Sequence, residues 1–185
     1  MEVFPSREHL FAKQVHGGVV REVIGEEVLG ECDGLLTSQL DKALVISHAD
    51  CQAAIFYDPV QHILANIHCG WRGNVQNIYK NAVGMFTKRG TKPSDLFVCI
   101  SPSLGPQNAE FIHYQKEWPE ALWKFRLEEN RFDLWALSTH QLQQEGVLLS
   151  HIEVAGMCTK AQKEDFFSFR GEKITGRNST IAKLL

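Results

Sequence analysis

The sequence lacks any apolar run that approaches the ~20 residues needed to cross a bilayer. Its N-terminus, residues 1–10, mixes Glu2, Arg7 and Glu8 with apolar residues and lacks the apolar central segment of a secretory signal. These two absences predict a protein that stays in the cytoplasm and has no membrane partner.

Clustered positive charge is also scarce. The chain has 19 lysine and arginine residues against 22 aspartate and glutamate residues, which gives a formal net charge of -3. Its one compact basic stretch, formed by Lys88, Arg89 and Lys92, is typical of a solvated loop. Nucleic-acid binding usually needs a clustered basic face, so we expect no nucleic-acid partner.

Paired cysteines are missing as well. The five cysteines are widely spread, odd in number and include no CxxC pair. We therefore expect no disulfide framework, as is usual in a reducing compartment. A cysteine with a function here would be a metal ligand or a nucleophile.

The 185 residues instead contain short apolar runs and amphipathic segments, and their number fits a single domain, residues 1–185. Short apolar runs bounded by turn signals predict buried strands. These runs are residues 43–46, 53–57, 63–67, 96–100, 152–155 and 166–169.

Apolar residues at helical spacing predict three helices. The first covers residues 75–86, with Asn74 placed to cap its start. The second lies near residues 118–126, with a proline that is acceptable in the first turn. The third covers residues 133–144, begins at a capping aspartate and stops before Gly146.

The segment of residues 68–73 (HCGWRG) places a potential metal ligand beside a potential anion site. His68 would end an apolar strand, and a helix would begin soon afterwards, where free amides and the helix dipole favour an anion. Arg72 adds a planar, permanently charged fork suited to phosphate or carboxylate. Phosphorolysis and hydrolysis need this pairing, because one part polarises the substrate while the other holds the anion.

Two other segments supply further ligands. Cys51 follows a buried strand, and His16 lies in a loop opened by Gly17. One thiolate and two imidazoles, from Cys51, His16 and His68, would hold one zinc ion. The fourth zinc position would stay open for water or substrate, as in catalytic zinc sites.

Three residues beside these ligands are expected to contact the substrate, namely Gln14, Asp50 and Arg72. Asp50 is also the nearest candidate for a general acid. A carboxylate beside a metal loop nevertheless more often orients a ligand or closes a turn.

Each proposed ligand also has a structural interpretation. A single histidine is more often a hydrogen-bonded structural residue, and a single cysteine on a strand is usually a small buried hydrophobe. His48 and Cys51 form an HxxC pair that offers a rival ligand set. We rank His48 below His16, because a strand residue just before the loop can face away.

Together these segments resemble the laccase-domain family, also called the polyphenol-oxidase-like family of zinc purine nucleoside phosphorylases. That family carries segments of the types QVHG, DGL-T, ADC, HAGWRG and GP-x-I-GP, and a C-terminal FFSYRR…TGR stretch. The corresponding segments here, in the same order over almost the whole chain, are residues 14–17, 33–37, 49–51, 68–73, 101–106 and 166–177.

The resemblance implies an α+β fold with mixed β-sheets packed between helices in a single compact domain. It implies that His16, Cys51 and His68 are the zinc ligands. It further implies phosphorolysis of a purine nucleoside (adenosine, inosine, guanosine or methylthioadenosine) by phosphate, and deamination of adenosine.

Departures from the family pattern gather around the site. The chain begins fifteen residues before His16, so it resembles a shortened member. Cys69 replaces the usual alanine, and His48 stands where threonine is common. The ligand set itself is intact.

Two other functions also fit these residues. Cys51 would be the nucleophile of a metal-free cysteine hydrolase, with His68 or His16 as its base. Alternatively, a zinc ion closed by His48 or Cys69 as fourth ligand would only staple a non-catalytic binding module.

Overall fold

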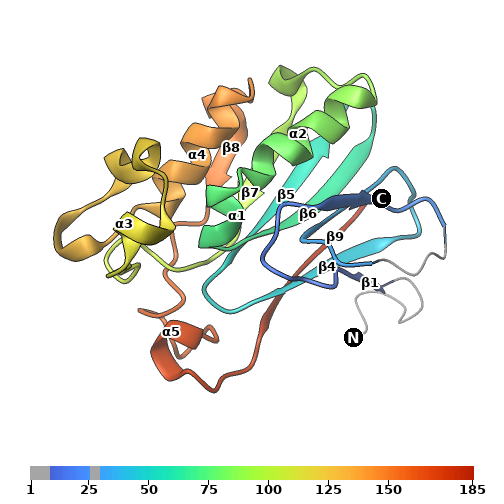
Figure 1. Cartoon of the computed structure of the whole chain (residues 1–185). Coiled ribbons are helices and arrows are strands. Elements are labelled where there is room, and N and C mark those ends of the chain that lie inside the picture. The colour runs from blue at the N-terminus through green and yellow to red at the C-terminus, as the bar shows by residue number, and fades with distance from the viewer. Residues whose placement is uncertain (1–8, 26–29) are drawn as a thin grey trace.

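The computed structural model describes residues 9–25 and 30–185, which form two β-sheets and a set of helices (Figure 1). The larger sheet has six strands in the order β2-β3-β6-β5-β7-β8. These strands are β2 (Val20–Glu22), β3 (Gly34–Thr37), β5 (Gln52–Asp58), β6 (Ile63–Cys69), β7 (Phe97–Ile100) and β8 (Ile152–Val154). The smaller sheet, in the order β1-β4-β9, consists of β1 (His9–Phe11), β4 (Ala43–His48) and β9 (Asn178–Lys183).

Both sheets are mixed. In the larger sheet, β6 pairs antiparallel with β3 and β5, whereas the edge strands β2 and β8 pair parallel with their neighbours. In the smaller sheet, β4 pairs parallel with β1 and antiparallel with β9. The predicted α+β class with mixed sheets is confirmed.

Helices cover one face of the larger sheet (Figure 1). The α-helices are α1 (Trp71–Val75), α2 (Ile78–Lys88), α3 (Tyr114–Glu117), α4 (Leu134–Gln144) and α5 (Phe169–Glu172). Short 3-10 helices are Pro93–Asp95, Glu120–Phe125, Glu128–Asn130 and Leu149–His151. Tyr79 and Phe86 of α2 are buried against Phe56 and Ile67 of the sheet. Within the described ranges, every helix is too short or too polar to span a bilayer.

The smaller sheet covers the opposite face of the larger one. Successive strand residues point to opposite faces, so Leu36 of β3 packs with the helices while its neighbour Leu35 packs the other way. Leu35 and Leu64 share a buried cluster with Leu44 of β4 and Ala182 of β9. The larger sheet is therefore the middle layer. Cys51 lies directly before β5 and His68 near the end of β6, so both are at the same end of this sheet.

The predicted strands at residues 43–46, 53–57, 63–67, 96–100 and 152–155 are confirmed as β4 to β8. The strand predicted at residues 166–169 is wrong. Ser168 instead caps α5, because its side chain accepts a hydrogen bond from the amide of Gly171. The strands β1, β2 and β3 precede the first predicted strand and are too short to show a clear pattern.

The helix predicted at residues 75–86 is α2, and it begins three residues later than predicted, at Ile78. Asn77 caps α2 by accepting from the amide of Lys80, whereas Asn74 is buried and donates to Ser138 of α4. Asparagine is a common helix cap, but the side chain of Asn74 hydrogen-bonds to α4 instead. The helix predicted near residues 118–126 is a 3-10 helix, and the helix predicted at 133–144 is confirmed as α4.

Candidate metal centre and substrate cavity

Three potential metal ligands that are distant in the sequence meet at one end of the larger sheet. His16 lies in the loop between β1 and β2, Cys51 in the turn between β4 and β5, and His68 near the end of β6. Their ligand atoms all lie within 4.8 Å of one another. The rings of His16 and His68 meet edge to face, with their centroids 4.9 Å apart. The fold thus brings these side chains close enough to share one ion.

The buried carboxylate of Asp33, just before β3, holds two of these ligands. Its Oδ1 lies 2.8 Å from Nδ1 of His68 and 2.9 Å from the backbone nitrogen of His16. Its Oδ2 accepts from the backbone nitrogen of Gly17 at 2.7 Å. Because Asp33 engages Nδ1 of His68, the Nε2 atom is left for an ion, an arrangement typical of metal-bound histidines.

Two residues of the site have a left-handed backbone, His16 with φ 60° and Asp50 with φ 83°. Residues other than glycine adopt this conformation only when the surrounding structure compensates for it, and such residues concentrate at functional sites. For His16 the compensation is visible, because Asp33 accepts hydrogen bonds from the amides of residues 15, 16 and 17.

Gly70, which links β6 to α1, leaves the space that the ligands need. A Cβ atom at this position would lie 2.9 Å from Sγ of Cys51 and 3.2 Å from Cδ2 of His16. The first of these distances is shorter than a Cβ contact tolerates. The absence of a side chain at Gly70 therefore allows Cys51 and His16 to approach each other.

The charges of the cluster are coupled. Burial disfavours the Cys51 thiolate, but hydrogen bonds and charge from His16 and His68 outweigh it and lower the pKa of Cys51 to about 7. Burial likewise disfavours the charged form of His68, but Asp33 and Cys51 raise its pKa to about 9. The site favours a thiolate next to positive charge, which is also the environment that a cation would provide.

The two candidate fourth ligands are engaged elsewhere. Nε2 of His48 lies 3.0 Å from Oγ1 of Thr180, and burial together with the charge of His68 lowers the pKa of His48 to about 4. The thiol of Cys69 donates to the carbonyl oxygen of Gly70, and burial raises its pKa. In the part of the chain that the structure describes, the ligand cluster consists of His16, Cys51 and His68. The donor set suits a zinc ion with one open position.

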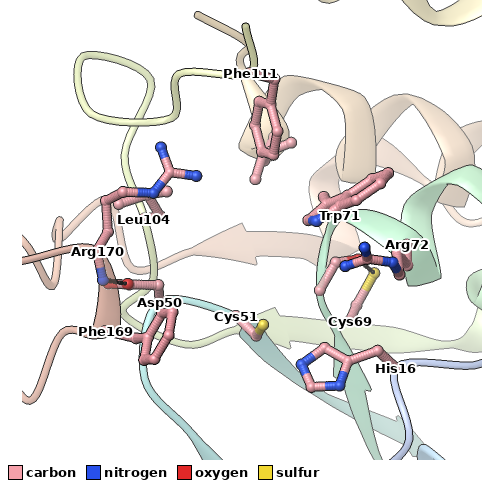
Figure 2. Close-up of a pocket in the computed structure, with 12 residues that line it drawn as sticks. His16, Asp50, Cys51, Cys69, Trp71, Arg72, Leu104, Phe111, Phe169 and Arg170 are labelled. Carbon is pink, nitrogen blue, oxygen red and sulfur yellow. Dashed lines mark hydrogen bonds between the residues drawn. The ribbon is translucent and has the colours of Figure 1, made fainter. Parts of the chain in front are cut away.

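A cavity of about 240 Å³ opens above this cluster. Figure 2 shows His16 and Cys51 on one side of it, and the aromatic rings of Trp71, Phe111 and Phe169 around it. The remaining lining residues are Asp50, Cys69, Gly70, Arg72, Leu104, Leu134 and Arg170. The cavity thus combines apolar, aromatic walls with a few charged groups at defined positions, as ligand sites generally do.

Two arginines reach the cavity from different elements, and each lies over an aromatic ring. The guanidinium of Arg72 in α1 lies 4.2 Å from the ring centroid of Trp71. That of Arg170 in α5 lies 5.4 Å from the ring centroid of Phe111, and its Nη1 donates to the carbonyl oxygen of Glu110 at 2.8 Å. An aromatic ring therefore positions each cation at the cavity wall, and carbonyl oxygens hold Arg170 in addition.

Asp50 fastens the C-terminal part of the chain to the turn that carries Cys51. Its Oδ1 accepts from the hydroxyls of Thr159 and Ser168, each at 2.7 Å. Its Oδ2 accepts from the backbone nitrogen of Arg170, a bond drawn in Figure 2. Asp50 therefore positions the wall formed by α5, in line with the turn-closing role considered for it above.

Gln14 lies two residues before His16, and its side chain bonds to the backbone of Ser47. Its side-chain amide donates to the carbonyl oxygen of Ser47 at 2.8 Å and accepts from the Ser47 backbone nitrogen at 3.0 Å. These bonds tie the His16 loop to β4. The contact of Gln14 with substrate stays a prediction.

Residue types alone did not single out Asp33, Phe111 or Arg170. Asp33 and Arg170 do lie in two of the segments that resemble the laccase-domain family, residues 33–37 and 166–177. That signal points to the segments but gives no role, because the partners of both residues are distant in the sequence. Phe111 lies in a loop and has no sequence signal of its own.

This fold is that of a laccase-like domain. Residues 2–184 match the family described as multi-copper polyphenol oxidoreductase laccase, and the chain belongs to that family.

Curated relatives and a solved structure agree with this assignment. The purine nucleoside phosphorylase YlmD of Bacillus subtilis is 28% identical over 197 residues, covering 91% of this chain and 68% of the relative. A purine nucleoside phosphorylase of Bacteroides thetaiotaomicron is 32% identical over 155 residues, covering 78% of this chain but 57% of the relative. The crystal structure of the hypothetical protein YfiH of Bacillus licheniformis superposes with a TM-score of 0.90 at 25% identity, covering 99% of this chain and 76% of that one. The chain therefore spans only part of each of these proteins.

Proposed function

We propose that the protein is a purine nucleoside phosphorylase whose zinc ion is held by His16, Cys51 and His68. In this reaction the glycosidic carbon–nitrogen bond breaks, a bond forms between the sugar carbon and a phosphate oxygen, and the purine leaves with a proton. One observation carries the proposal: the three ligand atoms lie within 4.8 Å of one another beside an aromatic-walled cavity. The names of the relatives support the choice of reaction.

One thiolate and two imidazoles suit zinc in tetrahedral geometry. A blue-copper centre adds an axial methionine to these donors, and among the described residues no methionine lines either cavity at the cluster. When bound, zinc would act as a Lewis acid that polarises a substrate oxygen. Nε2 of His48 and the thiol of Cys69 are bonded to other groups, and neither residue belongs to the ligand cluster, which supports an open fourth position facing the cavity.

The cavity walls would bind the purine. Trp71 and Phe111 contact each other with ring centroids 5.9 Å apart, and both line the cavity with Phe169. Aromatic side chains offer large apolar surfaces to a flat heterocycle and exclude water. Arg170, fixed by the carbonyl of Glu110, would limit how the purine enters.

Arg72 is the proposed partner of phosphate in this cavity. Its guanidinium is permanently charged and is oriented over the Trp71 ring, so little freedom is lost when an oxyanion binds. Asp50 would act by holding α5 in place, since both its carboxylate oxygens accept hydrogen bonds. Gln14 would act by holding the His16 loop against β4.

We propose deamination of adenosine as a second activity of the same centre. In that reaction water replaces the amino group, which leaves as ammonia and yields inosine. An open metal position beside a purine-sized aromatic cavity suits attack by water as well as by phosphate. The two activities differ in their dependence on phosphate, so they are separable by measurement.

The alternative function is a metal-free cysteine hydrolase. One observation favours it: the pKa of Cys51 falls to about 7, because two imidazoles flank the thiol and outweigh the effect of burial. A thiolate next to an imidazole is the arrangement that nucleophilic catalysis requires. Metal analysis distinguishes the two functions. One zinc ion per chain supports the phosphorylase, whereas covalent labelling of Cys51 in active, metal-free protein supports the hydrolase.

The larger sheet contributes side chains to the apolar clusters on both of its faces. This supports the proposal that residues 1–185 act as one domain.

The decisive experiment is incubation of the pure protein with adenosine and with inosine, each with and without phosphate. We expect phosphate-dependent release of adenine or hypoxanthine together with ribose phosphate, and phosphate-independent conversion of adenosine to inosine. Cys51→Ala should abolish every product. Ribose phosphate formed equally well by Cys51→Ala would contradict the proposal.

A further inference from the structure

A second cavity, of about 260 Å³, reaches the same metal centre. All three candidate ligands line it, whereas the aromatic cavity of Figure 2 is lined by His16 and Cys51 but not by His68. The other residues that line the second cavity are Gln14, Ser47, His48, Ala49 and Arg177.

The two cavities open on opposite sides of the end of β6. His68 and Cys69 are consecutive residues of that strand, so their side chains point to opposite faces of the sheet. His68 lines the second cavity, and Cys69 lines the aromatic one. The ligand cluster is therefore accessible from two sides, and a nucleoside in the aromatic cavity would leave the second cavity free.

The second cavity contains one permanent positive charge. Its lining contains no aspartate or glutamate, and its permanently charged group is Arg177. Nη1 of Arg177 donates only to carbonyl oxygens of its own loop, at 3.1 Å to Thr175 and 2.9 Å to Gly176. Among the described residues, no carboxylate forms an ion pair with Arg177.

This charge has a consequence when the cluster holds a divalent cation. The Cys51 thiolate and the Asp33 carboxylate bonded to His68 balance that cation, so the exposed guanidinium of Arg177 is the unpaired positive charge facing the same space. An anion that enters this space can pair with the guanidinium while it approaches the cation. An arginine fork also matches the geometry of a phosphate oxyanion.

The walls of this cavity are held in place before any anion enters. Gln14 joins the His16 loop to β4 through two hydrogen bonds with the backbone of Ser47. Arg177 lies immediately before β9, whose residues pair with β4 from Asn178 opposite His48 onward. The segment that carries Arg177 is therefore anchored to the strand that forms the opposite wall.

We propose that this cavity is an oxyanion site of the metal centre, which takes inorganic phosphate or the phosphate group of a ribose phosphate, with Arg177 as its cationic donor. The inference rests on the proposed phosphorylase function only for the identity of the anion. It adds an oxyanion contact on the side of the cluster away from the aromatic cavity, distinct from the Arg72 contact proposed for the phosphate that reacts with the nucleoside.

The test is calorimetric titration of zinc-loaded protein with inorganic phosphate and, in a separate arm, with ribose 1-phosphate. Arg177→Gln should weaken the binding of both at least about tenfold, because one charge-assisted hydrogen-bonding partner is lost. Arg177→Lys keeps the charge and should recover part of the affinity. Lys88→Gln removes an exposed positive charge at the end of α2 and should leave both affinities unchanged. Zinc content, measured in parallel, should be equal in all variants.

Two outcomes overturn the inference. In the first, phosphate binds equally well to Arg177→Gln and to the unmodified protein. In the second, Arg72→Gln weakens phosphate binding while Arg177→Gln does not. That result places the oxyanion in the aromatic cavity and leaves the proposed phosphorylase function intact. Failure of that function looks different, because phosphate then binds in an Arg177-dependent way while no nucleoside is cleaved.

Discussion

Nδ1 of His68 lies 2.8 Å from Oδ1 of Asp33, and these two side chains are only 2% and 0% exposed. A carboxylate this close fixes both the ring orientation and the tautomer of the imidazole. Through the backbone of His16, the same carboxylate also shapes the loop of a second ligand. The geometry of the candidate metal centre thus depends on a residue that would not touch the metal.

Asp33→Asn is expected to weaken zinc binding by about 10-fold to 100-fold, the usual effect of losing such an outer partner. An amide oxygen is a weaker acceptor than a carboxylate, and it cannot accept from His68, His16 and Gly17 equally well. Competition with a chromophoric chelator measures the affinity. Asp165→Asn, at an exposed position, is the control. Equal affinities in the two variants would contradict the role of Asp33.

Zinc affinity should depend on pH in a defined direction. The pKa of His68 is about 9, because Asp33 and Cys51 favour its charged form, and the pKa of Cys51 is about 7. An incoming ion must displace one proton between pH 7 and 9 and two below pH 7. Affinity should therefore fall about tenfold per pH unit below 9 and about a hundredfold per unit below 7.

Chelator competition between pH 6 and 9, combined with proton release in weakly buffered solution, measures this dependence. Asp33→Asn should flatten the slope between pH 7 and 9, because the His68 imidazolium loses its carboxylate partner. An affinity that is constant across this range would show that His68 binds no proton in competition with the ion.

Gly70→Ala should disturb the centre. The added Cβ would lie 2.9 Å from Sγ of Cys51, so one ligand must move, at a cost of roughly 1–3 kcal/mol in the free energy of unfolding. Zinc affinity should fall as well. Gly84→Ala is the matched control, since nothing lies within 4 Å of its Cβ and the site is in α2. The control should gain about 0.5–1 kcal/mol of stability. Thermal unfolding and zinc content that change alike in both variants would refute this account of Gly70.

Arg72→Ala should raise the KM for phosphate at least about tenfold while leaving the zinc content unchanged, because it removes a cation from the cavity and no metal ligand. Steady-state kinetics at varied phosphate measures this. An unchanged dependence on phosphate removes Arg72 from the role and leaves Arg177 as the cationic donor.

Metal analysis of the purified protein should find about one zinc ion per chain, the stoichiometry of a single three-ligand centre. Copper-dependent phenol oxidation should be absent despite the description of the family, because such oxidases use several histidine-rich centres and the described residues contain one ligand cluster. Removal of the ion by a chelator should abolish nucleoside cleavage, and added zinc should restore it. Activity that persists after complete removal would favour the cysteine hydrolase.

Local patterns in the sequence predicted the central strands well, because buried strands such as β5 and β6 are short apolar runs between turn signals. They failed where tertiary contacts override local preference. Asn74 has the properties of a helix cap, yet α4 engages its side chain and α2 begins at Ile78. Residues 166–169 form an apolar run, but Asp50 pulls this segment into a turn and the start of α5.

The site was predictable in part. The residue types suggested His16, Cys51 and His68 as one ligand set, and the family resemblance implied the same set. Spacing alone could not show that they meet, since only the fold brings them together. The contacts around them depend on pairings between remote segments. Asp33 reaches His68 across 35 positions, and Asp50 reaches Ser168 across 118. No local pattern encodes either pair.

The bonds from Asp50 to Thr159, Ser168 and Arg170 join two separate stretches of chain, one that carries the metal ligands and one that forms part of the cavity wall. All three candidate ligands occur before residue 70, whereas the side chains of Phe169 and Arg170 belong to a C-terminal stretch that the Asp50 carboxylate helps to hold against the site. Mutations in that docked stretch can therefore retune which molecule is admitted without disturbing ion capture. Substitutions in the C-terminal stretch can thus change substrate selectivity during evolution while the three metal ligands stay the same.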